Sequence, residues 1–395
     1  MTDVQQTQTN TAPVLFDTLP TDNGYVIGMI QLNAEKTLNA LSLDMIDLIA
    51  AQLATWSTDD NVAMVFMHAA GEKAFCAGGD LQQLYQSMLS HHASEQRDDI
   101  RANQYACDFF EREYRLDYVI HTYPKPILCW GHGIVMGGGM GLMAGASHRV
   151  VTEKSRLAMP EIAIGLFPDV GGSYFLNQMP EKVGLFLALT GASINASDAR
   201  LINLADYMIA QADKAQVLKT LQQQAWTNLQ TKNGFLLDAI LSDAQLKFAE
   251  SSNAVQPGPI ETHLTTIQAL CNNDDIDQTI ENIINHSSDD KWLAKAAASL
   301  KKGSPSSAHL ADLLLHRAKN MSLADVFRME YLAALHCAAR PDFAEGIRAL
   351  IIDKDQQPHW QPATHTEITP EWINGFINNP WPAEAHPLAD LGSND

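Results

Sequence analysis

The 395-residue sequence has few cysteines and a shortage of positive charge. The five cysteines are odd in number and form no CxxC pair, which argues against a disulfide framework or a structural zinc site and favours a reducing compartment. Basic residues number 26 against 46 acidic ones, so no global positive field exists to attract nucleic acid or an anionic membrane. These shortages exclude classes of partner, but they leave room for an anionic ligand held by a local site.

The sequence also shows no long hydrophobic run and no segment typical of a secretory leader. The longest nearly apolar stretch, from Ile134 to Ala146, is too short to span a bilayer and is interrupted by glycines. The first residues are polar and show neither a basic segment nor an apolar one, so no secretory signal is expected. We therefore expect a soluble cytoplasmic protein without a membrane partner.

The first half of the sequence alternates between segments typical of strands and segments typical of helices. Apolar runs are followed by residues at helical spacing, and glycine-bearing loops join them. The strand-like runs are residues 25–32, 62–68, 126–130 and 148–152, and the clearest helical ones are residues 42–56 and 80–90. Such an alternation predicts an α/β fold with crossover connections.

After about residue 190 the pattern becomes helical, rich in Ala, Leu, Gln and Lys with few β-branched runs. The segments expected to be helical are residues 196–230, 234–251, 257–284, 289–302, 307–319 and 322–338, with a short helix at 370–377. Several prolines in the last part, among them Pro358, Pro362, Pro370 and Pro380, predict an extended or turn-rich end. We therefore predict a mobile tail over residues 1–12, an α/β core over 13–195, a helical region over 196–355 and a proline-containing tail over 356–395.

Two glycine-bearing loops, residues 73–81 (KAFCAGGDL) and 131–142 (GHGIVMGGGMGL), each lie between a strand signal and a helix signal. A glycine loop that opens a helix exposes unpaired N–H groups at the positive end of the helix dipole, which suits a polarised oxygen or an anion. Neither loop matches the phosphate-binding or dinucleotide fingerprints. The alternative is that these glycines only allow tight turns and close packing. Two such loops in one α/β core favour an oxyanion site.

Two carboxylates, Glu161 and Asp169, stand in the otherwise uncharged run of residues 159–173. Apolar surroundings would raise their pKa values and suit them to proton transfer or nucleophilic attack. Each has a structural alternative, since Asp169 precedes Gly171 as a helix N-cap would and Glu161 follows Pro160 as a first-turn residue would. Taken as a pair, the two acids favour a functional site.

At these residues the sequence resembles the crotonase (enoyl-CoA hydratase/isomerase) superfamily. The matching segments are LNAEKTLNALS, KAFCAGGDL, PKPILCWGHGIVMGGGMGL and MPEIAIGLFPDVGGSYFL. The last of these, together with residues 342–363, is similar to the 3-hydroxyisobutyryl-CoA hydrolase branch, which serves valine catabolism. The resemblance extends from about residue 22 to residue 363. It implies a crotonase-like spiral core of ββα units followed by a helical C-terminal region.

The resemblance also implies roles for individual residues. It assigns an oxyanion hole to the backbone N–H groups of Gly79 and Gly138, and an acid pair to Glu161 and Asp169. Glu113 is implied as a further acid of the substrate pocket, with a solvated helix face as the alternative because it ends a run of charged residues. The substrate would be an acyl-CoA bound by Glu113, Gly138, Glu161 and Asp169. No metal and no cofactor besides the CoA of the substrate are expected, and a homo-oligomer stays open.

One departure from the hydratases bears on the reaction. The glycine helix of those enzymes carries a glutamate where this sequence has Gly141, whereas Asp169 replaces what is commonly a glycine. Because the acid has changed place, a thioester hydrolase is the leading hypothesis. A hydratase or isomerase of the same fold and a non-catalytic acyl-CoA-binding protein are the alternatives. Whether Glu161 is a nucleophile or a general base is left open.

Overall fold

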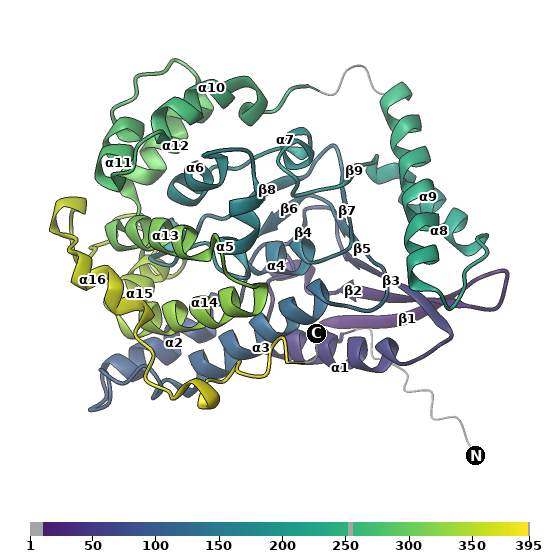
Figure 1. Ribbon diagram of the computed structural model, residues 1–395, viewed down its shortest axis with the longest axis horizontal. Helices are drawn as coiled ribbons and strands as arrows, with labels where there is room; N and C mark the ends of the chain where they lie inside the picture. Colours follow the sequence, from purple (N-terminus) through teal and green to yellow (C-terminus); the bar gives the residue numbers. More distant parts are fainter. Residues whose placement is uncertain (1–10, 252–255, 394–395) are drawn as a thin grey trace.

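The computed structural model describes residues 11–251 and 256–393, with the strands at the centre of the molecule and helices around them (Figure 1). Most of the tail predicted over residues 1–12 therefore lies outside the described residues. The predicted α/β class and the helical character of the second half are both confirmed. The domain divisions at residues 195 and 355 stay predictions.

Two sheets form the centre. The larger has the strand order β1-β2-β3-β5-β7-β9, in which β1 is antiparallel to β2 and the other neighbours are parallel, and the smaller has the all-parallel order β4-β6-β8. The strands are β1 (Val14–Pro20), β2 (Val26–Leu32), β3 (Val62–Ala69), β4 (Ala74–Cys76), β5 (Ile127–Gly131), β6 (Ile134–Met136), β7 (His148–Val151), β8 (Arg156–Ala158) and β9 (Tyr207–Met208). β3 and β5 are apolar and almost wholly buried, as strands covered on both faces must be.

The helices of the first half are α1 (Leu43–Ser57), α2 (Leu81–His92), α3 (Gln104–His121) and α4 (Gly138–Ala144), and a 3₁₀ turn, η2, spans Glu161–Ile164. Helix α1 begins where the sequence predicts it, because the Ser42 hydroxyl accepts a hydrogen bond from the N–H of Met45. The glycine loops connect β4 to α2 and β6 to α4. Two strand ends thereby bring their loops to one side of the core.

The rest of the chain is mostly helical. Its helices are α5 (Gly172–Phe175), α6 (Val183–Thr190), α7 (Ala196–Leu201), α8 (Lys214–Gln222), α9 (Gln230–Ser251), α10 (Pro259–Cys271), α11 (Ile276–Ile284), α12 (Lys291–Lys302), α13 (Pro305–Ala318), α14 (Leu323–Ala339), α15 (Pro341–Ile347) and α16 (Pro370–Asn374). The prediction of helix throughout residues 196–230 is wrong. Asn203 has a positive φ of 63°, which ends α7, and β9 then pairs with β7 before α8 begins.

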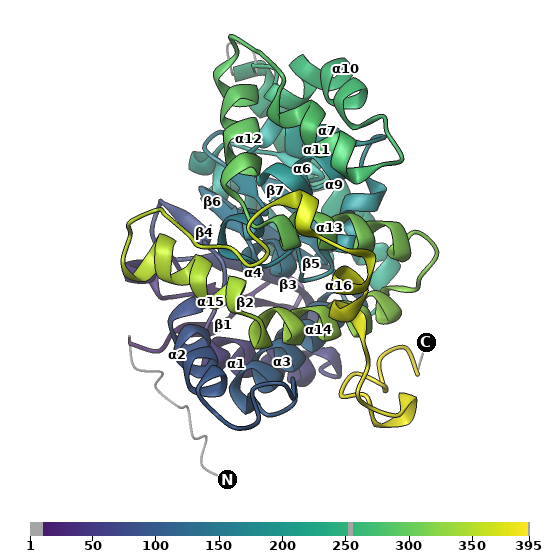
Figure 2. The same ribbon diagram turned by 90° about the vertical axis from the view of Figure 1, so that its left-hand side faces the viewer.

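The late helices cover the elements that carry the predicted acids. Helix α14 packs along α3, as the lower part of Figure 2 shows. Helix α15 packs against η2 and α14. A π-helical turn over Arg348–Ile352 follows α15 directly. The segment from α15 to the end of this turn is therefore part of the wall around the candidate site. No helix in the described part of the chain is long and apolar enough to cross a bilayer.

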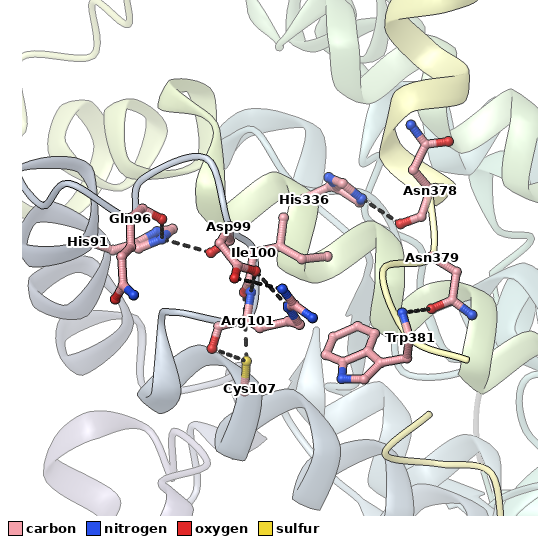
Figure 3. Close-up of polar contacts among 10 residues, drawn as sticks. All are labelled: His91, Gln96, Asp99, Ile100, Arg101, Cys107, His336, Asn378, Asn379 and Trp381. Atoms are coloured by element: carbon pink, nitrogen blue, oxygen red, sulfur yellow. Dashed lines mark hydrogen bonds and ion pairs between the residues drawn. The ribbon is translucent and has the colours of Figure 1, made fainter. Parts of the chain in front are cut away.

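The proline-containing end of the chain lies against the surface near α3. Figure 3 shows the loop between α2 and α3 facing residues 378–381. These two segments line a surface hollow of about 540 Å³. His91 Nε2 donates to the carbonyl oxygens of Gln96 and Asp99, both at 3.1 Å, and His336 Nε2 donates to that of Asn378 at 2.8 Å. The predicted short helix at residues 370–377 is confirmed as α16 followed by a 3₁₀ turn. This end of the chain is linked to α3 by the ion pair of Arg115 with Asp390 at 2.6 Å.

Candidate active site

A cavity of about 190 Å³ lies between the glycine loops and the late helices. The acids and glycines predicted as site residues all line it, namely Gly79, Glu113, Gly138, Glu161 and Asp169. Apolar walls come from α3, from η2 and from α15 with the turn after it, and they include Phe109, Phe110, Leu166, Phe343 and Ile351. Larger hollows elsewhere on the surface contain none of the predicted residues. The structure therefore brings together every predicted site residue, while their roles stay predictions.

The two glycine loops meet at the cavity. A Cβ atom placed on Gly138 would lie 3.6 Å from the amide nitrogen of Gly79 and 2.5 Å from Glu113 Oε1. Gly78 and Gly137, which precede the two glycines, have φ values of 115° and 49° that other residues rarely adopt. Within residues 11–251 and 256–393, no hydrogen bond uses the N–H of Gly79 or Gly138. Two glycines with unpaired N–H groups therefore line the same small cavity.

Glu161 is the first residue of η2 and is only 5% exposed. Burial, and after it the charge of Asp169, raises the pKa of its carboxyl well above the usual range. Its Oε2 atom has no hydrogen-bond partner among the described residues. Glu161 thus lies in the first turn of η2 and also lines the cavity, so its place at the start of a helical turn is compatible with a functional role.

Asp169, also 5% exposed, accepts a hydrogen bond from the Tyr114 hydroxyl at 2.8 Å. Burial raises the pKa of Asp169 to about 6, and the Tyr114 hydrogen bond limits that rise. The alternative that Asp169 caps the following helix is wrong. The N–H groups of Gly171 and Ser173 donate to the carboxylate of Glu330 at 2.8 Å instead.

Glu113 points into the cavity from α3 and is 3% exposed. Burial and the charge of Asp169 raise the pKa of Glu113 well above its usual range. The alternative of a solvated helix face is therefore wrong for Glu113, although it holds for Arg112 beside it, which is exposed and paired with Asp47 at 2.8 Å. Within this run of charged residues on α3, Arg112 therefore faces solvent and Glu113 faces the cavity.

Three buried residues near the cavity are missing from the sequence prediction: Tyr114, Asp117 and Glu330. Burial raises the pKa of Glu330 to about 8, and burial followed by the charge of Glu113 raises that of Asp117 well above its usual range. No ion pair among the described residues involves these acids or the predicted ones. Asp117 follows Glu113 by four residues and so shares its helix face, a signal that would have found it, whereas nothing local marks Tyr114 or Glu330.

Replacing Tyr114 by Phe should change how stability depends on pH. A carboxyl whose pKa is higher in the folded protein binds a proton that the unfolded chain has lost, so the free energy of unfolding falls as pH rises between the two pKa values. For Asp169 this window extends from 3.8 to about 6. Without the Tyr114 hydroxyl the pKa of Asp169 should rise further, and the fall in stability should continue above pH 6.

Urea unfolding of the wild type and the Tyr114→Phe variant between pH 4 and 8 measures this difference. Subtracting the two curves removes the contributions of the other buried acids. A Tyr123→Phe variant is the control, because the hydroxyl of Tyr123 donates to the Leu53 carbonyl oxygen at 2.7 Å rather than to an acid. A difference curve that is flat above pH 6 for Tyr114→Phe would contradict the prediction.

Comparison with known proteins places this site in a family. Residues 27–377 match the family model described as enoyl-CoA hydratase/isomerase. The chain belongs to this family. The resemblance to the crotonase superfamily seen in the sequence is thereby confirmed.

The curated relatives that match most of the chain are named as hydrolases. The mitochondrial 3-hydroxyisobutyryl-CoA hydrolase of Danio rerio is 36% identical over 347 residues, which are 88% of this chain and 86% of that protein. The protein of the same name from Homo sapiens is 35% identical and covers 89% of this chain and 86% of its own length. The predicted similarity to the hydrolase branch is therefore confirmed.

Solved structures of the same fold carry other names. A carnitinyl-CoA dehydratase from Mycobacterium thermoresistibile is 30% identical with a TM-score of 0.77, covering 93% of this chain and 96% of its own. An enoyl-CoA hydratase from Rhodobacter sphaeroides 2.4.1 is 28% identical with the same TM-score, covering 93% and 98%. Because one fold carries several reaction names, the reaction has to be argued from the site.

Proposed function

We propose that the protein hydrolyses the thioester of 3-hydroxyisobutyryl-CoA, or of a related 3-hydroxyacyl-CoA, to the free hydroxy acid and CoA, as a step of valine catabolism. The observation that carries the proposal is the pair Glu161 and Asp169 in one cavity, with Gly141 where a hydratase glutamate would stand. The names of the relatives point to the same reaction. CoA enters as part of the substrate, and no step needs a metal or a further cofactor.

The thioester oxygen lies, in this proposal, between the N–H groups of Gly79 and Gly138. Attack on the carbonyl carbon moves negative charge onto that oxygen, and donors already in place stabilise it without reorganisation. A single donor of this kind is worth about 2.7–4 kcal/mol of the barrier. The two glycine loops supply both donors because each N–H is unpaired and faces the cavity.

Glu161 first passes its proton to Asp169, which has the lower pKa, and then attacks the carbonyl carbon as a carboxylate. The C–S bond breaks to give a mixed anhydride and the CoA thiolate. Asp169 or Glu113 gives its proton to the thiolate, and water cleaves the anhydride to restore the Glu161 carboxylate and release the hydroxy acid. In the other route Glu161 acts as a general base on water, which attacks the thioester directly. We favour the covalent route because a desolvated carboxylate is the more reactive nucleophile.

The cavity has to accommodate both the apolar carbon skeleton and the polar β-hydroxyl of the acyl group. The aromatic and aliphatic walls suit its carbon skeleton, whereas the β-hydroxyl needs an acceptor that replaces water. Asp169 and Glu113 are the acceptors within the cavity. An analogue that differs by one methyl group would be discriminated by only about 1–3 kcal/mol, so a related 3-hydroxyacyl-CoA should also react.

The purified protein should release CoA thiol from 3-hydroxyisobutyryl-CoA in the presence of a chelator, and it should hydrate crotonyl-CoA poorly. A thiol reagent measures the first reaction, and loss of absorbance from the conjugated thioester measures the second. Efficient hydration without thiol release would establish the hydratase alternative. Binding of acyl-CoA without either reaction would establish the non-catalytic one.

The location and assembly of the protein stay predictions. The hydrolases that match the chain are named mitochondrial, whereas the few scattered cysteines favour a reducing compartment such as the cytoplasm. The proposed partners are limited to an acyl-CoA and, as an open point, further copies of the same chain.

A further inference from the structure

One face of helix α3 carries a stripe of three titratable side chains. Glu113, Asp117 and His121 recur every fourth residue and therefore share that face. Eight residues of helix place Glu113 and His121 about 12 Å apart along the axis. Glu113 lines the cavity, Asp117 is 0% exposed, and His121 is partly exposed. The stripe thus leads from the cavity toward the surface.

The glycines of α4 make room for this stripe. Each of its side chains occupies space that a Cβ atom would need on α4 or on the residue that caps its C-terminal end. A Cβ atom would lie 2.5 Å from Glu113 Oε1 if built on Gly138, 2.7 Å from Asp117 Oδ2 if built on Gly141, and 2.7 Å from His121 Cδ2 if built on Gly145. The stripe therefore lies directly against the α4 backbone.

The polar atoms along the stripe lack partners. Both carboxyl oxygens of Asp117 and the Nε2 atom of His121 are buried, and within the described residues none of them makes a hydrogen bond. Buried polar atoms without partners are rare in folded proteins and call for an explanation. The proposed hydrolysis uses neither residue.

The proposed reaction releases a proton that has to leave the cavity, and the stripe offers a path for it. At neutral pH, a thioester and water yield a carboxylate, a thiol and one proton. The acyl group enters a small cavity with the CoA chain behind it, so the proton forms while the entrance is occupied. A second way out for the proton would let turnover proceed without opening that entrance.

We propose that Asp117 and His121 relay this proton from Glu113 to solvent along the interface of α3 and α4. The proposal rests on the proposed hydrolysis. The O–H bond of Glu113 breaks as one forms on the first oxygen of Asp117, and the O–H bond on the second oxygen breaks as an N–H bond forms at His121 Nε2. The imidazolium then loses a proton to solvent. Both oxygens of Asp117 take part, in keeping with both being unpartnered.

The resting states of the two residues suit this direction. Burial, followed by the charges of Glu113, Asp169 and Glu330, raises the pKa of Asp117 well above its usual range, so Asp117 rests as a neutral acid. Burial, followed by the charge of Arg149, lowers the pKa of His121 to about 4, so its imidazole rests neutral and holds a relayed proton only as a short-lived intermediate before solvent takes it.

Aromatic rings flank His121, and the gaps along the stripe are short. The ring centres of Tyr174 and Phe327 each lie 6.3 Å from the centre of the imidazole ring. Side chains one helical turn apart are separated by about 6 Å, which one bridging water spans with two hydrogen bonds. Each transfer along the stripe is therefore within reach.

An Asp117→Asn variant tests the relay, because Asn keeps the size of the side chain but cannot exchange an acidic proton. We expect kcat for CoA release to fall at least about tenfold with KM within twofold, since proton transfer by a positioned group contributes about 10²–10⁴-fold. The solvent deuterium isotope effect on kcat should increase, because proton exit becomes rate-limiting. The control is Asp198→Asn, a buried acid that holds the start of α10 through the N–H groups of Ile260 and Glu261.

A His121→Ala variant tests the outer end and decides the matter if Asp117→Asn does not fold. Imidazole added to this variant should restore kcat, whereas pyrazole, which has the same shape but is too weak a base, should not. Wild type and Glu161→Gln measured with the same additives correct for direct attack of imidazole on the thioester. Equal rescue by both compounds would mean that His121 only fills space, and the relay would be wrong.

Unchanged kcat and isotope effect in both variants would also overturn the relay while leaving the hydrolase function intact. A wild-type protein that releases no CoA is a different outcome, because then the proposed function fails and the relay fails with it.

Discussion

Replacing Glu161 by Gln should lower the rate of CoA release by at least about 10³-fold, the range expected when the attacking or proton-abstracting group of a reaction is removed. Gln keeps the length of the side chain but can neither attack a thioester nor accept a proton at neutral pH. Because Glu161 is buried and its Oε2 atom has no partner among the described residues, the change should leave the fold intact. A steady-state thiol assay with matched unfolding curves measures both effects.

Glu111→Gln is the matched control, since Glu111 is a partly exposed glutamate that pairs with Arg115 at 3.4 Å. We expect its turnover to stay within about twofold of wild type, because exposed ion pairs contribute little. Near-normal turnover of Glu161→Gln would mean that the chemistry depends on another acid of the cavity.

The two routes for Glu161 differ in where solvent oxygen goes. A single turnover in ¹⁸O-water with excess enzyme should leave label in the Glu161 carboxylate if water cleaves the anhydride at the protein carbonyl. Direct attack of water on the thioester labels only the hydroxy acid. Because cleavage at the acyl carbonyl would hide an anhydride, hydroxylamine trapping completes the test. Failure of both, with Glu161→Gln inactive, would assign the general-base role.

Gly138→Pro should lower turnover by at least about 10²-fold through loss of one oxyanion donor. Gly138 is the first residue of α4, and proline is well tolerated at the first position of a helix because the N–H there has no partner within the helix. The substitution therefore removes the donor without breaking the helix. The thiol assay at saturating substrate measures the loss.

A Gly138→Ala variant separates the effect of losing the N–H donor from the effect of adding a Cβ atom. Alanine brings the same Cβ atom to within 2.5 Å of Glu113 Oε1 but keeps the N–H group, so the ratio of the two variants reports the donor alone. Gly234→Ala, where the added Cβ meets nothing within 4 Å, should behave as wild type. Equal losses in Gly138→Pro and Gly138→Ala would show that the oxyanion is held elsewhere.

The sequence predicts well those elements whose pattern is strong and local. β2, β3, α1 and α14 all appear within one or two residues of their predicted bounds, because buried strands and amphipathic helices leave clear periodicities. β1 and β9 were missed, since β1 is largely exposed and β9 has only two residues. The glycine loops and the isolated acid pair pointed to an oxyanion site with Glu161 and Asp169, and the family resemblance added Gly79, Gly138 and Glu113 as residues that line the cavity.

The remainder of the site depends on contacts between distant parts of the chain. Glu330 holds the N–H groups of Gly171 and Ser173 from a position some 160 residues later, and no local pattern could show this. Tyr114, which holds Asp169, lies in a helix whose charged run read as solvent-facing. The sequence therefore predicted the groups at the cavity but not the groups that orient them.

The walls of the cavity come from both ends of the chain, from Ala77 near the beginning to Ile351 near the end. During synthesis, the sheets and the glycine loops can form long before the last wall segment has left the ribosome. A nascent or truncated chain would then present an open groove with exposed acids and no enclosed pocket. Desolvation of the acids, and with it their raised pKa values, arrives only when the late helices close over them.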